Sequence, residues 1–112
     1  FDTKAITIQG AGMNQTIIVN NNIVDSNGRG GVLFSYLTKL GGISRITGMT
    51  IDSSNSNLDP YGYNRGVITI SGYSQTFRVD NIHFIIASGH AITTDGDHLF
   101  GVIDHNIFDR IG

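Results

Sequence analysis

The chain has 112 residues and a net charge of −2, with nine acidic side chains against seven lysines and arginines. This length suits one domain. Because no basic run appears, nucleic acids are not expected partners, and because no apolar run approaches the roughly 20 residues that span a bilayer, neither is a membrane. Cysteine is absent, which excludes disulfides and cysteine-based metal sites.

The amino-acid composition favours strands over helices. Seventeen isoleucines, six valines and ten threonines stand against four alanines and no glutamate, and β-branched residues prefer strands. Fifteen glycines and ten asparagines supply residues that turn tightly. The composition therefore predicts an all-β protein with many short strands and tight corners.

Short strands that end in glycine recur along the chain. They read AITIQG from Ala5, VITISG from Val67 and AITTDG from Ala91. A second strand starts twelve residues after each of these, as IIVNNN, VDNIHF and IDHNIF. A further copy, VLFSYL from Val32 followed by ITGMTI, has two extra residues between its strands. Four units, spaced 27, 35 and 24 residues apart, are therefore predicted.

Units that share one internal offset predict a solenoid, here a parallel β-helix of about four coils with at most three strands per coil. Ile68 and Ile70 alternate around Thr69, so we expect aliphatic side chains to stack inside and threonines to lie outside. A β-sandwich also has short strands, although its strands need not recur with one offset. Residues 1–112 are expected to form a single parallel β-helix domain.

The opening ITIQGAG…QTIIV, together with FRVDNIHF and GVIDHNIF, resembles right-handed parallel β-helix proteins of the pectate-lyase-like superfamily. The resemblance covers nearly the whole chain and implies right-handed coils. Members of this superfamily are commonly several times longer, so the chain resembles about four coils of a longer helix. Coil ends present unpaired backbone groups and apolar edges, which predicts end-to-end association or a homo-oligomer.

Two aspartates from successive units are expected to lie side by side. Asp104 falls in the column of Asp80 and Thr47, and His105 follows it directly. Paired strands lie about 4.8 Å apart, so the two carboxylates would repel each other unless one holds a proton or a cation sits between them, as in hydrolases and calcium sites. The alternative is that both are corner residues that point into water.

The second resemblance concerns the phrase Val102 to His105. Pectate lyases carry a Trp-Ile-Asp-His phrase near their calcium-binding groove, and Val-Ile-Asp-His is similar, with Val102 in place of the tryptophan. The aspartate column, together with this resemblance at Asp104 and His105, gives Asp80, Asp104 and His105 as the candidate catalytic residues. The close pair of carboxylates in the column makes Asp80 and Asp104 candidate ligands of Ca²⁺, the only cofactor expected.

The longest loop, from Ser53 to Arg65, carries Tyr61 and Tyr63. Aromatic faces beside hydrogen-bonding groups suit sugar rings, although the tyrosines could equally cover the side of the helix. The candidate substrate-binding residues are therefore Tyr61, Tyr63 and Arg65 of this loop, together with Arg78, a cation near the aspartates. A polysaccharide is the expected partner.

Two functions follow from these patterns, and the fold alone cannot decide between them. The first is a structural or carbohydrate-binding β-helix segment of a larger extracellular or cell-surface or virion-surface protein. The second is a polysaccharide lyase or glycoside hydrolase that uses the stacked aspartates, with calcium as the expected ion.

Overall fold

A computed structural model describes residues 6–21, 34–38, 43–56, 66–72, 76–87 and 89–111. These residues form nine strands and no helix, and so confirm the predicted all-β class. The strands are β1 (Thr7–Gln9), β2 (Ile17–Val19), β3 (Phe34–Thr38), β4 (Ile43–Ser53), β5 (Ile68–Gly72), β6 (Thr76–Ile86), β7 (Ile92–Asp95), β8 (Gly101–Asp104) and β9 (Ile107–Arg110). No helix that could cross a membrane occurs in the described part of the chain.

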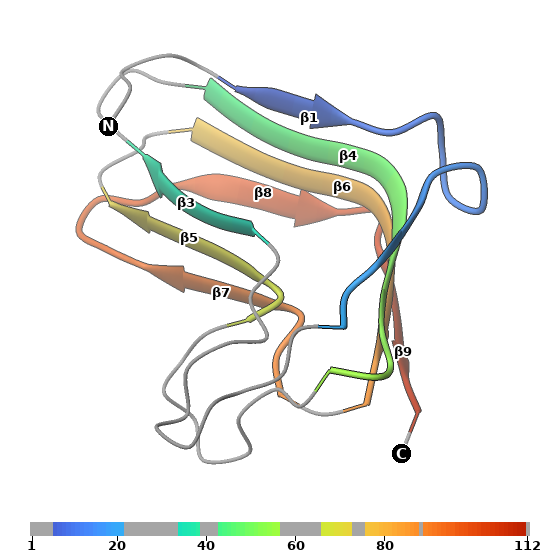
Figure 1. Ribbon diagram of the computed structural model, residues 1–112. Helices are drawn as coiled ribbons and strands as arrows, with labels where there is room; N and C mark the ends of the chain where they lie inside the picture. The colour runs from blue at the N-terminus through green and yellow to red at the C-terminus, as the bar shows by residue number, and fades with distance from the viewer. Residues whose placement is uncertain are drawn as a thin grey trace.

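The strands form two sheets that enclose one hydrophobic core (Figure 1). The larger sheet has the order β1-β4-β6-β8, with β2 also paired to β4 and β9 to β6, and the smaller one has the order β3-β5-β7. Every pairing between these strands is parallel. The chain alternates between the sheets, from β3 to β4, β5 to β6 and β7 to β8, so each pass lies beside the previous one.

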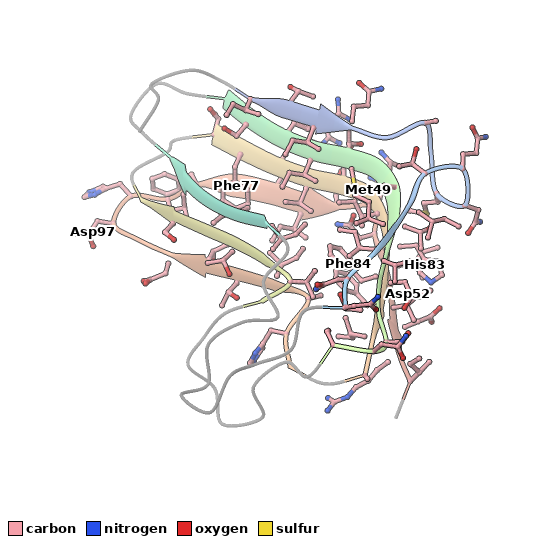
Figure 2. All side chains as sticks on the ribbon, viewed as in Figure 1. Met49, Asp52, Phe77, His83, Phe84 and Asp97 are labelled. Carbon is pink, nitrogen blue, oxygen red and sulfur yellow. The ribbon has the colours of Figure 1, made fainter. Side chains whose placement is uncertain are left out.

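The long strands β4 and β6 bend in the middle, and each half pairs with a different neighbour (Figure 1). Inward-facing side chains stack in columns across these strands, as Ile46, Val79 and Ile103 do. Phe84 is fully buried and stacks on Phe108 with ring centroids 5.2 Å apart. Figure 2 shows Phe84 on the inner side of the β6 bend, and the neighbouring His83 on the outer side.

The alignment of the last two predicted units is confirmed, and that of the first is not. Ile68 lies opposite Ile92, as the alignment of the units from Val67 and Ala91 requires. The strand in AITIQG, however, pairs with β4 through Ile8 and Ile46 and so belongs to the larger sheet. The prediction that it stacks with β5 and β7 is wrong, because its alternation suits either sheet and only the pairing decides between them.

Two further expectations for the smaller sheet need correction. The unit from Val32 places Leu33 opposite Ile68, whereas the structure pairs Phe34 with Ile68, a shift of one residue. Ile68 and Ile70 are buried as predicted, but Thr69 is also buried. Thr69 lies in the central strand of the smaller sheet, where its hydroxyl donates to the carbonyl oxygen of Gly66.

Candidate functional site

The candidate site lies on the outer face of the larger sheet, next to the bend of each long strand. Residues at the bend have left-handed backbone conformations, with φ of 73° at Gly48, 53° at Asn81 and 53° at His105. Glycine adopts this region freely, and asparagine and histidine enter it more often than most residues. These left-handed residues lie at one level of the sheet, within β4, within β6 and between β8 and β9, next to Asp80 and Asp104.

Two polar columns run across this outer face. Thr47, Asp80 and Asp104 are register partners, which confirms the predicted aspartate column. Two residues earlier on the same strands, Arg45 lies opposite Arg78. Since side chains two apart on a strand share a face, an arginine column stands beside the aspartate column.

The arginines and aspartates form a continuous series of ion pairs, called here the Arg–Asp ladder and made of Arg45, Asp80, Arg78 and Asp104. Arg45 donates from Nε to Asp80 Oδ1 at 2.9 Å and from Nη2 to Oδ2 at 2.6 Å. Arg78 donates in the same forked manner to Asp104, at 3.1 and 2.8 Å. Its Nε also lies 3.5 Å from Asp80 Oδ2. The cation between the two carboxylates is therefore Arg78.

Both carboxylates are held in the ionised form. The hydrogen bond from Arg45 lowers the pKa of Asp80 against the opposing effect of burial, and Asn81 Nδ2 donates to the same carboxylate at 2.9 Å. The hydrogen bonds from Arg78 and then His105 lower the pKa of Asp104. Neither group therefore keeps the proton that an acid catalyst needs near neutral pH.

Asp80 and Asp104 differ in their access to solvent. The side chain of Asp80 is 1% exposed and that of Asp104 is 28% exposed. The alternative that both are corner residues pointing into water is thus wrong for Asp80, because the long side chains of Arg45 on β4 and Arg78 on β6 cover it. His105 is 73% exposed, and its Nδ1 lies 2.8 Å from Asp104 Oδ2.

The arrangement does not fit the expected calcium ion. Calcium takes six to eight oxygen ligands, but all four carboxylate oxygens of Asp80 and Asp104 already accept hydrogen bonds from Arg45 or Arg78. Across the residues that the structure describes, no group of three or more acidic or histidine side chains gathers around a common point. An ion between the aspartates would have to displace Arg78.

A groove opens beside the ladder, where the connection from β1 to β2 is long. Seven residues separate Gln9 from Ile17, whereas two separate their partners Thr47 and Thr50. The longer connection projects from the bend of β4 (Figure 1). It is fixed by hydrogen bonds from Gly12 N to the Gly48 carbonyl oxygen, at 2.8 Å, and from Asn14 N to Thr50 Oγ1, at 3.1 Å.

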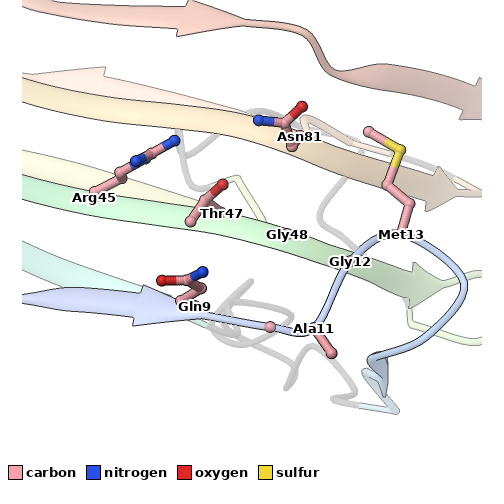
Figure 3. Close-up of a pocket in the computed structure, with 9 residues that line it drawn as sticks. Gln9, Ala11, Gly12, Met13, Arg45, Thr47, Gly48 and Asn81 are labelled. Carbon is pink, nitrogen blue, oxygen red and sulfur yellow. The ribbon is translucent and has the colours of Figure 1, made fainter.

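This cavity, called here the loop groove, has a volume of about 410 Å³ (Figure 3). Its lining residues are Gln9, Gly10, Ala11, Gly12, Met13, Arg45, Thr47, Gly48 and Asn81. Gly10 allows the close approach of the two backbones on which the groove depends, because a Cβ at this position would clash with the carbonyl oxygen of Gly48. The loop groove is therefore a polar recess formed by β1 with the loop that follows it, β4 and β6.

The structure brings some of the candidate residues together and leaves others undescribed. Asp80, Asp104, His105 and Arg78 form one cluster. Tyr61, Tyr63 and Arg65 lie outside the described residues.

Sequence reasoning missed Arg45 and Gln9, although the signal for Arg45 was present. The segments RITG and RVDN align when Ile46 is matched with Val79, and this match places Arg45 opposite Arg78. Gln9 had no comparable signal, because its strand was assigned to the other sheet.

No family model, curated protein or solved structure matches the chain.

Proposed function

We propose that the chain is a segment of a right-handed parallel β-helix of the pectate-lyase-like type, within an extracellular or cell-surface or virion-surface protein, and that it binds carbohydrate. The alternation of the chain between two parallel sheets supports the β-helix, since each pass stacks on the previous one. Parallel crossovers are overwhelmingly right-handed, which supports the handedness. Residues 1–112 then form one domain.

The observation that carries the binding function is the loop groove. Its volume of about 410 Å³ lies within the roughly 300–1,000 Å³ that small-molecule sites span. Amide, hydroxyl and guanidinium groups line it, and sugar hydroxyls can donate hydrogen bonds to such groups or accept them. The groove lies on the outer face of the sheet, where an extended polymer can reach it.

Affinity electrophoresis tests this function directly. The whole chain is run through native gels that contain a neutral polysaccharide such as glucomannan, or an acidic one such as polygalacturonate. We expect slower migration in at least one gel, restored to normal when soluble oligosaccharide is added as a competitor. Unchanged migration across a broad panel of polysaccharides would contradict carbohydrate binding.

A polysaccharide lyase or glycoside hydrolase is the second candidate function, and one observation favours it. Asp104 orients the exposed imidazole of His105 through the 2.8 Å contact at Nδ1, which leaves Nε2 available to exchange a proton with a substrate. An oligogalacturonate cleavage assay with the chain and with His105→Ala, each with and without calcium, tests it. Cleavage lost in the variant would support this candidate, and no cleavage by the unmodified chain would remove it.

Association through the coil ends stays a prediction. Large apolar side chains are exposed on the first and last coils described, namely Ile6, Ile17, Val19, Phe100, Val102, Ile103, Ile107, Phe108 and Ile111. Sedimentation velocity over a hundredfold range of concentration measures the association. A single species with the mass of one chain throughout would contradict it.

A further inference from the structure

We propose that the loop groove is selective for a neutral saccharide and discriminates against uronates, with Gln9, Arg45 and Asn81 as the groups that bind sugar hydroxyls. This inference rests on the carbohydrate-binding function proposed above, and it names the site and the chemical class of its ligand. Two features support it, namely the charge balance of the Arg–Asp ladder and the polar atoms that remain unpaired in the groove.

The cations described near the groove are already paired with carboxylates. Among the described lining residues Arg45 is the only charged one, and both of its hydrogen-bonded nitrogens are directed at Asp80. Arg78, the next cation along the ladder, donates two hydrogen bonds to the carboxylate of Asp104. A uronate carboxylate in the groove would share the Arg45 guanidinium with Asp80, whose charge already balances that of the arginine, and would lie near this second negative charge, which is unfavourable.

The polar atoms that remain unpaired suit hydroxyl groups. Within the described ranges, no hydrogen bond involves the Gln9 carboxamide, the Oδ1 atom of Asn81 or the Nη1 atom of Arg45. Together they offer donors and acceptors, and a sugar hydroxyl has one donor and two acceptor positions. A uronate carboxylate only accepts, so it would leave the Asn81 acceptor without a partner.

The groove also has an apolar flank. Figure 3 shows Met13 on the loop, with its side chain extending towards the strand that carries Asn81, while Gln9, Arg45 and Thr47 lie on the neighbouring strands. A thioether side chain adapts its shape easily and packs on apolar surfaces, such as the C–H face of a pyranose ring. Polar groups on one side and an apolar side chain on the other are the combination that a sugar ring requires.

Nuclear magnetic resonance on the ¹⁵N-labelled whole chain tests the inference. The probes are neutral pentasaccharides of glucose, galactose, mannose and xylose, compared with pentagalacturonate at the same concentration. We expect at least one neutral probe to shift the side-chain amide signals of Gln9 and Asn81 and the backbone signals of Gly10 and Gly48. Pentagalacturonate should bind at least about tenfold more weakly than that probe.

Gln9→Ala is the test variant, because the side chain is exposed and makes no hydrogen bond in the described structure. Thr94→Ala is the matched control, an exposed residue on β7 of the other sheet. Loss of one or two neutral hydrogen bonds should weaken binding of the neutral probe about three- to tenfold in the test variant. The control should bind like the unmodified chain.

The possible outcomes separate this inference from the function on which it rests. Tighter binding of pentagalacturonate at the groove signals would overturn the neutral selectivity and leave carbohydrate binding intact. Shifts confined to β3, β5 and β7, or equal affinities for Gln9→Ala and Thr94→Ala, would overturn the groove as the site. Binding of no probe at all would overturn the inference and, with unretarded migration in every polysaccharide gel, the proposed function as well.

Discussion

Asp80→Asn removes one negative charge from the centre of the Arg–Asp ladder and leaves the side-chain shape unchanged. Asp80 accepts two hydrogen bonds from Arg45 and one from Asn81. A hydrogen bond to a charged group contributes roughly 1.5–3 kcal/mol, but the side chain of Arg45 is 42% exposed, so solvent offsets part of its loss. We expect the free energy of unfolding to fall by about 2 kcal/mol.

Urea unfolding followed by circular dichroism measures this change, since the chain has no tryptophan to report it. With a slope of about 2 kcal/mol per molar urea, the midpoint should fall by about 1 M. Asp97→Asn, at an exposed turn, is the control and should leave the midpoint unchanged. A shift in Asp80→Asn no larger than that of the control would refute the argument that the ladder stabilises the fold.

The same variant tests how the stability of the chain changes as the pH falls. Arg45 lowers the pKa of Asp80 in the folded state, below the value of about 3.9 expected in the unfolded chain. The stabilisation is therefore fully present above that value and is lost as the pH falls through the folded pKa. The urea midpoint of Asp80→Asn should decline less steeply than that of the unmodified chain below about pH 4, and equal slopes would show that Asp80 is not the group responsible.

Three further predictions concern the core, one close backbone contact and the expected metal. Phe84→Ala should lower the free energy of unfolding, measured in urea, by about 3–4 kcal/mol. Phe108→Ala should lower it by less than half as much, because Phe84 is fully buried and Phe108 is 54% exposed. Equal losses would contradict the observed burial. Gly96→Ala should lower the free energy of unfolding by about 2–3 kcal/mol, since its Cβ would clash with the carbonyl oxygen of Gly72. Gly12→Ala should cost less, because both glycines have a positive φ but a Cβ at Gly12 would meet only Gln15 Cδ, at 3.9 Å. Millimolar calcium should leave the melting temperature unchanged, because Arg78 lies between the two aspartates; a rise of several degrees would show that calcium displaces it.

The sequence by itself determined the strand content and much of the register. Isoleucine-rich segments that recur with one offset predicted the aspartate column, because the same offset places Asp80 opposite Asp104, as the structure confirms. The left-handed corners were also encoded locally, since glycine, asparagine and histidine at the bend accept a backbone that β-branched residues resist.

The tertiary structure decided which strands pair and which charges meet. Alternation in AITIQG fits either sheet, so only the pairing of Ile8 with Ile46 placed it. The burial of Asp80 depends on arginines from its own strand, β6, and from the neighbouring strand β4, and neither its exposure nor its partners can be read from adjacent residues. Periodicity is a property of each segment by itself, whereas the ladder and the loop groove require residues 26 to 36 positions apart to meet. Those contacts exist only once the strands have paired.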